Sequence, residues 1–311
     1  MKKWTFLALT LAILLLLGAC GKKEESSSSA TSDDKTITIK HELGEAKVKE
    51  NPDKVVVFDF GVLDTLDELG VKVDGVPQAA VPPYLEDYKN SDYTNVGSLK
   101  EPDFEAIHSL KPDVIFISAR QADLYDEFAD IAPTVYIPVD STDYVNSFKS
   151  NMNTIAKIFN KEDEMKKELA EVDKEVKSIQ EETESLDSNA LVIMGSSEDI
   201  SAFGPESRFG IIHDVFGFKP ADDGIEKSTH GQKVTYEYVK EQNPGILFVI
   251  DRDAAFDPKA SIKESFENDL VKKTQAFKDD RIIYLNGAEW YLSGGGLQSM
   301  KHMIEDAKKA F

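Results

Sequence analysis

Six short apolar runs, rich in β-branched residues, alternate along the chain with amphipathic or polar segments. Each run is continuously apolar, as expected for strands of parallel sheets that are covered on both faces. Three runs precede and three follow a long stretch without a strand signal. The pattern predicts an α/β protein with two Rossmann-like lobes, each built on a parallel sheet, and a ligand cleft between them. The runs are Val55–Phe58, Val114–Ile117, Val135–Ile137, Leu191–Met194, Ile246–Ile250 and Ile282–Leu285.

The stretch between the third and fourth runs carries a single apolar stripe. Its members follow a 4-3 spacing, with charged residues elsewhere: Met165, Leu169, Val172, Val176, Ile179, Thr183 and Leu186. This spacing is typical of one amphipathic helix. We expect a helix at 161–187 to link a first lobe at 36–160 to a second lobe at 188–311. A coiled-coil dimer is the alternative, although a threonine in so short a stripe would weaken the zipper, and we expect a monomer.

An internal repeat supports two lobes of one topology. A shift of 132 residues places Phe104–Ile107 on Tyr236–Val239, and Val114–Ile117 on Ile246–Val249. The register ends with Arg120 on Arg252. A weaker match pairs Phe60–Leu63 with Phe209–Ile212. In open α/β sheets ligands bind beyond the carboxyl ends of the strands, so both arginines are predicted at the crevice.

Arginine usage points to the same crevice. Of the 36 basic residues only four are arginines: Arg120, Arg208, Arg252 and Arg281. Arg208 occupies a polar loop between a strand and a helical run, whereas Arg281 precedes a strand and should lie at the remote end. A guanidinium is always charged, offers five donors and stacks on aromatic faces. A surface ion pair is the alternative for any single arginine, but three on crevice loops indicate an anion site.

The N-terminus has the layout of a bacterial lipoprotein signal. A basic start, an apolar run and the small residues of Leu17–Cys20 are the marks of a secretory signal with a cysteine directly after the cleavage site. We expect residues 1–19 to be the signal peptide, Cys20 to carry lipid, and the serine-rich residues 20–35 to form a flexible linker. A transmembrane anchor is the alternative, but it needs about 20 apolar residues. The folded part is therefore predicted at the extracytoplasmic face of the cell membrane.

Composition excludes several classes of function. A net charge of −21 repels nucleic acid and anionic lipid, so the lipid must supply the anchoring. A single cysteine excludes an intramolecular disulfide and a zinc finger. Nucleophile-elbow, P-loop and dinucleotide-binding motifs are missing, and Gly294–Gly296 before a helical run is more typical of a tight turn than of a phosphate cradle. The histidines are scattered without metal-ligand spacing, which disfavours an importer of bare metal.

The chain resembles the substrate-binding lipoproteins of iron–siderophore ABC importers, and most of all the petrobactin-binding lipoproteins of Gram-positive bacteria. The resemblance rests on the lipobox, the helix at Glu105–Ile107 running into Leu110–Ile115, its repeat at Pro244–Leu247 and the central helix. It implies a ferric siderophore in a shallow cleft, delivered to a membrane permease driven by an ATPase. It also implies that Arg120, Arg208 and Arg252 form a basic triad around an anionic catecholate complex.

The resemblance further implies an aromatic side chain at the cleft rim, within Glu289–Gly296. We expect Trp290 and Tyr291 to line the cleft, and Tyr84 to reach it from a loop, although each could be an ordinary core or surface residue. In this family one acidic residue on each lobe pairs with permease arginines. The candidates lie on the helical runs that follow Arg120 and Arg252. They are Asp123, Asp126 and Glu127 in the first lobe and Glu264 and Glu267 in the second. We expect Glu127 and Glu264 to be the two that dock on the permease.

Three other functions stay open. A haem- or corrinoid-binding protein of the same fold would need an axial tyrosine or histidine for haem. A structural or adhesive lipoprotein would bind no small molecule. A cell-surface hydrolase would need a catalytic arrangement that the sequence does not display. The leading hypothesis requires no cofactor, no protein ligand to iron and no catalytic residue, because a hexadentate chelator already fills the coordination sphere of the ferric ion.

Overall fold

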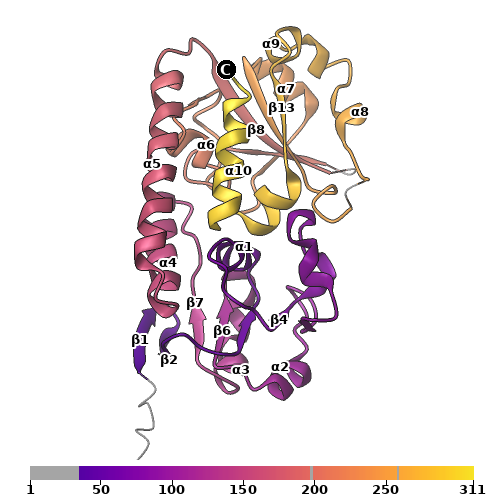
Figure 1. Cartoon of the computed structure of the whole chain (residues 1–311). Helices are drawn as coiled ribbons and strands as arrows, with labels where there is room; N and C mark the ends of the chain where they lie inside the picture. The colour runs from indigo at the N-terminus through magenta and orange to yellow at the C-terminus, as the bar shows by residue number, and fades with distance from the viewer. Residues whose placement is uncertain (1–34, 197–198, 258) are drawn as a thin grey trace, which may run out of the picture. The chain divides into compact units, whose positions relative to one another are not determined.

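The first lobe is built on a five-stranded parallel sheet in the order β5–β4–β3–β6–β7 (Figure 1). The three apolar runs predicted in this half form its centre and one edge, and their side chains are buried because helices cover both faces. The other two strands are only two residues long and left no apolar run in the sequence. The strands are β3 (Val55–Val57), β4 (Gly75–Val76), β5 (Thr94–Asn95), β6 (Val114–Ile117) and β7 (Thr134–Tyr136).

The computed structural model describes residues 35–196, 199–257 and 259–311. The predicted signal peptide, Cys20 and nearly all of the predicted linker lie outside these ranges. An antiparallel hairpin of β1 (Thr36–His41) and β2 (Gly44–Lys49) precedes the first sheet. The helices of the first lobe are α1 (Phe60–Glu68), α2 (Phe104–Leu110), α3 (Tyr125–Ala129) and α4 (Tyr144–Ile158), with 3₁₀ segments η1 (Gln78–Ala80), η2 (Pro83–Lys89) and η3 (Ala119–Leu124).

The second lobe contains a six-stranded sheet in the order β11–β9–β8–β12–β13, with β10 beside β8. Its centre is parallel, as predicted, whereas β9 and β11 run antiparallel to their neighbours and make this a mixed sheet. The reason is local: Ser196 and Asp199 are hydrogen-bonded across a short connection, which can join only antiparallel strands. The strands are β8 (Asn189–Gly195), β9 (Ile200–Phe203), β10 (Lys219–Pro220), β11 (Gln232–Val234), β12 (Ile246–Asp251) and β13 (Ile282–Leu285).

The last helix of the second lobe, α10, packs on α1 of the first lobe and on the linking helix α5 (Figure 1). It follows a π-helical segment, η5, which carries two of the predicted site residues. The helical segments of this lobe are α6 (Ile211–Asp214), α7 (Tyr236–Gln242), α8 (Lys263–Phe266), η4 (Val271–Lys273), α9 (Gln275–Lys278), η5 (Ala288–Ser293) and α10 (Leu297–Lys308).

The linking helix α5 spans Glu162–Glu184, within the predicted range. It packs against α4 of the first lobe and α10 of the second. Five of the seven stripe residues are buried against the rest of the chain, and Thr183, the polar member, donates its hydroxyl to the carbonyl of Phe216 at 3.0 Å. The stripe is therefore the core-facing side of the helix and not a coiled-coil seam. Among the residues that the structure describes, no helix is both long and apolar enough to cross a membrane.

The sequence repeat corresponds to a structural repeat. Helices α2 and α7 begin at the matched caps Asp103 and Thr235, whose side chains accept the backbone N–H of Ala106 and Tyr238 at 3.0 and 3.3 Å. Both helices end in a left-handed residue, with φ of 52° at Lys111 and 46° at Asn243. A buried strand follows in each lobe. The repeat therefore holds for this helix–strand unit, but the two lobes do not share one topology throughout, because only the second sheet contains antiparallel strands.

Candidate ligand-binding cleft

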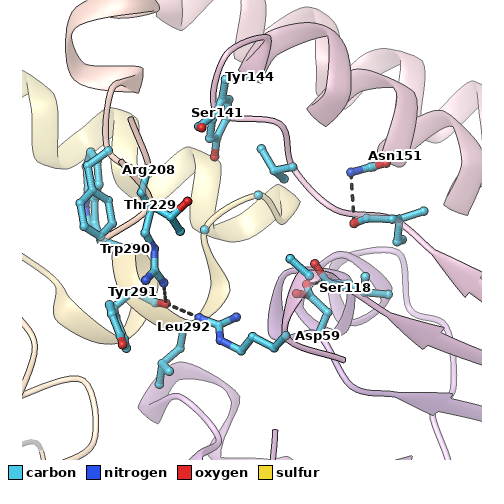
Figure 2. A pocket seen from close by; sticks show the side chains of 18 of the residues that line it. Asp59, Ser118, Ser141, Tyr144, Asn151, Arg208, Thr229, Trp290, Tyr291 and Leu292 are labelled. Carbon is cyan, nitrogen blue, oxygen red and sulfur yellow. Dashed lines mark hydrogen bonds between the residues drawn. The ribbon is translucent and has the colours of Figure 1, made fainter. Parts of the chain in front are cut away.

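A cavity of about 670 Å³ lies between the lobes (Figure 2). The first lobe contributes residues just beyond the carboxyl ends of β3, β6 and β7, among them Asp59, Ser118 and Val139. The second lobe contributes the loop after β9, the loop before β11 and the segment η5. The cavity therefore occupies the crevice that the strand pattern predicted.

Two arginines from opposite lobes converge on one backbone carbonyl in this cavity. Arg120, on η3, and Arg208, on the loop after β9, donate to the carbonyl oxygen of Tyr291 at 2.8 and 2.6 Å. The two dashed lines that meet at Tyr291 in Figure 2 mark these bonds. The π-helical turn of η5 presents this carbonyl to both guanidinium groups, and π-helical turns occur frequently at functional sites.

The surroundings of Arg208 are electrostatically unusual. Burial, and next the positive charge of Arg120, hold the pKa of Arg208 below its ordinary value. Its guanidinium carbon lies 4.2 Å from the centre of the Tyr291 ring, within cation–π range. Two cations are thus held near each other around one neutral acceptor. An anion entering the cavity would relieve this repulsion, so the geometry favours anionic ligands.

Asp59 is an acidic residue on the first-lobe side of the cavity, within the electrostatic influence of Arg120. Its carboxylate caps α1 by accepting the backbone N–H groups of Gly61 and Val62 at 2.9 and 3.0 Å. Burial raises the pKa of Asp59, and the charge of Arg120 acts against this shift. The carboxylate is committed to the helix terminus, which leaves the donors of Arg120 directed across the cavity.

Arg252 borders a smaller adjoining cavity of about 200 Å³. This space shares Arg208, Thr229, His230 and Tyr291 with the main cavity. Arg252 approaches Asp253 at 3.9 Å, so the ion pair considered as the alternative is present in a loose form. The structure therefore brings Arg120 and Arg208 together and places Arg252 one compartment away. Arg281, as expected, lies elsewhere, donating to the carbonyl of Ala310.

The predicted aromatic residues have different positions. Trp290 and Tyr291 both line the main cavity; Trp290 is only 3% exposed, and its Nε1–H donates to Asp306 at 2.9 Å. Tyr84 does not line it. The Tyr84 hydroxyl bonds to Asp64 at 3.0 Å and to the Ser293 hydroxyl at 2.7 Å, which holds the ring at the junction of the lobes.

Several residues at the main cavity carried no sequence signal. They come from loops and from α4, where single polar residues are common; the polar ones are Asp59, Lys100, Ser118, Ser141, Tyr144, Asn151, Thr229 and His230. Phe256 lies beside Tyr291 but outside the lining of either cavity. It is 58% exposed and meets the Tyr291 ring edge-on, with the ring centres 5.9 Å apart.

The predicted docking residues are accessible but untested by the structure. Glu127 on α3 and Glu264 on α8 are exposed, as are Asp123 and Asp126. Glu267 is engaged within its own lobe, accepting the Tyr284 hydroxyl at 3.1 Å. Glu127 and Glu264 therefore stay predictions.

Comparison with known proteins agrees with this architecture. The family model described as periplasmic binding protein matches residues 55–288. The chain is 51% identical to the petrobactin-binding protein YclQ of Bacillus subtilis, over 99% of this chain and 98% of that protein. The crystal structure of YclQ superposes with a TM-score of 0.86 at 53% identity, covering 89% of this chain and 98% of that one. The ferric-anguibactin-binding protein FatB of Vibrio anguillarum is 35% identical, over 88% of this chain and 87% of FatB. On its fold, its interlobe cleft and these matches, the chain belongs to the periplasmic binding protein family.

Proposed function

We propose that this protein is the substrate-binding lipoprotein of an ABC importer and captures an anionic ferric siderophore, petrobactin or a related catecholate, for iron uptake. The observation that carries the proposal is the convergence of Arg120 and Arg208, from opposite lobes, on the Tyr291 carbonyl. A bound anion would replace one neutral acceptor with several charged ones. Charge-assisted hydrogen bonds to guanidinium are stronger than neutral ones, so the exchange favours binding.

The chemistry of such a ligand suits the cleft. The chelator supplies all the ligands of the ferric ion, so the protein must recognise negative charge and flat rings. Arginines supply forked donors, while Tyr291 and Trp290 supply aromatic surface. A volume of about 670 Å³ lies in the range of small-molecule sites. The names of the relatives support the same ligand class, because YclQ is a petrobactin-binding protein and FatB binds ferric anguibactin.

The N-terminal sequence supports the location that this function needs. Lipid on Cys20 and a linker at 20–35 would tether the folded unit to the extracytoplasmic face of the cell membrane. Stable tethering takes more than one acyl chain. The loaded protein, a monomer, would then dock on a permease through Glu127 and Glu264, and an ATPase would drive transport. The charge of −21 argues against nucleic acid as a partner.

Quenching of Trp290 fluorescence tests the ligand directly. Trp290 lines the cavity, and the other tryptophan, Trp4, belongs to the predicted signal peptide. We expect saturable quenching by ferric petrobactin and other anionic ferric catecholates, and weaker binding of a neutral ferric trihydroxamate, which would leave desolvated guanidinium groups unpaired.

Haem and cobalamin belong in the same panel, because Tyr291 and His230 border the cavity and could serve as axial ligands. Tight haem binding with a Soret band would overturn the siderophore assignment. Equal or tighter binding of the trihydroxamate would overturn the anion preference.

A further inference from the structure

The N-terminus of α10 has no cap of its own. Its cap position is Gly296, which carries no side chain. The first backbone N–H groups of a helix have no partner within the helix and need acceptors from elsewhere. Here these groups belong to Leu297, Gln298 and Ser299.

The acceptors come from α1 of the other lobe. Thr65 Oγ1 accepts the N–H of Leu297 at 3.0 Å. Asp64 accepts the N–H of Gln298 through Oδ1 at 3.3 Å and that of Ser299 through Oδ2 at 3.0 Å. Both side chains are completely buried. A carboxylate is also favoured electrostatically at a helix N-terminus, so Asp64 and Thr65 together form an N-cap that crosses between the lobes.

Two glycines make this approach possible. A Cβ atom at Gly296 would overlap the Asp64 carboxylate and the Gly61 carbonyl. A Cβ atom at Gly61 would lie 2.8 Å from the Gly296 nitrogen. The backbones of α1 and α10 therefore meet at a distance that no larger residue permits. This accounts for the third member of the Gly294–Gly296 run.

The cap is joined to the ligand cleft through η5. This segment carries Tyr291 and leads through the glycine run directly into α10. Ser299 ties the two together, since its hydroxyl donates to the Ser293 carbonyl at 2.6 Å. Tyr84 bonds to both Asp64 and the Ser293 hydroxyl. The start of α10, the end of η5 and α1 thus form one hydrogen-bonded unit.

We propose that Asp64 and Thr65 are positioning residues of the ligand cleft. By capping α10 across the lobes they hold η5 against the first lobe, in the orientation in which Arg120 and Arg208 reach the same Tyr291 carbonyl. Neither residue borders the cavity, so their effect on the ligand is transmitted through η5. The inference depends on the proposed function only where ligand affinity is measured.

The test compares Asp64→Asn and Thr65→Val with the unaltered protein in two measurements. The first is the rate of amide hydrogen exchange at Leu297, Gln298 and Ser299, which reports the cap without any ligand. The second is the affinity for ferric petrobactin by Trp290 quenching. At pH 8, above the pKa of about 7 that burial gives Asp64, we expect Asp64→Asn to increase the exchange rates and the dissociation constant by about tenfold each, the effect of losing one charged hydrogen bond. Thr65→Val should act more weakly, and Thr65→Ser, which keeps the hydroxyl, should restore both values.

Asp113 provides a matched control. Its carboxylate also accepts two backbone N–H groups, those of Asp53 and Lys54, both at 2.9 Å. These bonds lie within one lobe, at the amino end of β6 and away from the cleft. Asp113→Asn should leave both the affinity and the exchange at 297–299 unchanged.

If Asp64→Asn folds and amide exchange at residues 297–299 is unchanged, Asp64 does not stabilise the N-terminus of α10. If the affinity for ferric petrobactin is unchanged, Asp64 is not a positioning residue of the cleft. If Asp113→Asn loses as much affinity as Asp64→Asn, the loss reflects general destabilisation, and the positioning role of Asp64 is wrong. If Asp64→Asn does not fold, Thr65→Val decides by the same criteria. If the unaltered protein binds no ferric siderophore, the proposed function fails, and the exchange rates still decide on the cap.

Discussion

Arg120 and Arg252 occupy the same position of the repeat, yet they do different things. Arg120 reaches across the cleft to the Tyr291 carbonyl, whereas Arg252 stays over its own lobe beside Asp253. The residue before each explains the difference. Asp251 accepts the backbone N–H groups of Asp253, Ala254 and Ile262 and so folds its loop back onto the second lobe. Ala119, at the matching position, has no side chain that could do this.

The comparison shows what a repeat conserves. Helix caps, left-handed ends and buried strands recur, because they depend on a few neighbouring residues. The roles of side chains at the strand ends do not recur, because one change, from alanine to aspartate, redirects the loop. A repeat therefore predicts where a ligand cleft lies better than it predicts which of its residues hold the ligand.

The largest expected effect concerns the acidic residues that follow the two arginines. If the lobes dock on the permease symmetrically, Glu127→Arg and Glu264→Arg should each abolish uptake of the ferric siderophore in cells while leaving its affinity unchanged. Charge reversal is used because the loss of one exposed ion pair contributes little. Glu241→Arg, exposed at the end of α7 that leads into β12, is the control. Normal uptake in both variants would place the docking surface elsewhere.

Asp64, like Arg120, bonds across the two lobes, and its titration should make the stability of the protein depend on pH. Burial raises the pKa of Asp64 from 3.8 to about 7. The folded state therefore binds this proton more tightly than the unfolded state, and the stabilisation is complete below pH 3.8 and lost as the pH rises to about 7. The tyrosines Tyr84 and Tyr144 face this carboxyl and stay protonated, because burial raises the pKa of each.

The unaltered protein should accordingly lose up to about 4 kcal/mol of unfolding free energy relative to Asp64→Asn between pH 4 and 7. Urea unfolding of both proteins across this range measures the difference. Parallel stability curves would show that Asp64 does not titrate in the folded protein.

The arginines themselves sharpen the comparison. Arg120→Ala should weaken binding of ferric petrobactin by about 1.5–3 kcal/mol, the contribution of charge-assisted hydrogen bonds. Arg252→Ala should cost less than about 1 kcal/mol, as expected for a half-exposed group in a side compartment. Arg120→Lys should recover only part of the loss, because lysine has no fork. Equal losses at the two positions would mean that the bound ligand spans both cavities and that the repeat is functionally symmetric.

The smallest expected effect on ligand binding concerns Phe256, which the 132-residue shift of the repeat pairs with Leu124. Leu124 packs on the first-lobe core, whereas Phe256 is exposed beside Tyr291. Phe256→Ala should weaken binding of an aromatic ferric catecholate by about 0.5–1.5 kcal/mol, the worth of an aromatic pair. Ferric citrate, which has no ring, should bind the variant as before. Titration of both complexes measures this difference, and equal losses would exclude a contact with the ligand's ring.

The sequence alone determined the elements that depend on continuous apolar runs or helical stripes. All six predicted runs are strands, and α5 lies where its stripe placed it. Strands β4, β5 and β10 were not predicted, because each has only two residues and so forms no recognisable apolar pattern. The sparse use of arginine directed attention to Arg120 and Arg208, which line the main cavity, since a residue type kept for a few positions stands out in the sequence. Their role in ligand binding stays a prediction.

Only the tertiary structure decided how these parts cooperate. Arg120 bonds to a carbonyl 171 residues away, and Asp64 caps a helix 235 residues away. Tyr84, predicted at the cleft, is instead held by the junction of the lobes. A hydrogen bond of this kind leaves no local signal, because any aspartate or tyrosine can form it once the backbone brings a partner within about 3 Å. Periodicity records which face of an element is buried, whereas the partner of a polar side chain depends on how the two lobes meet.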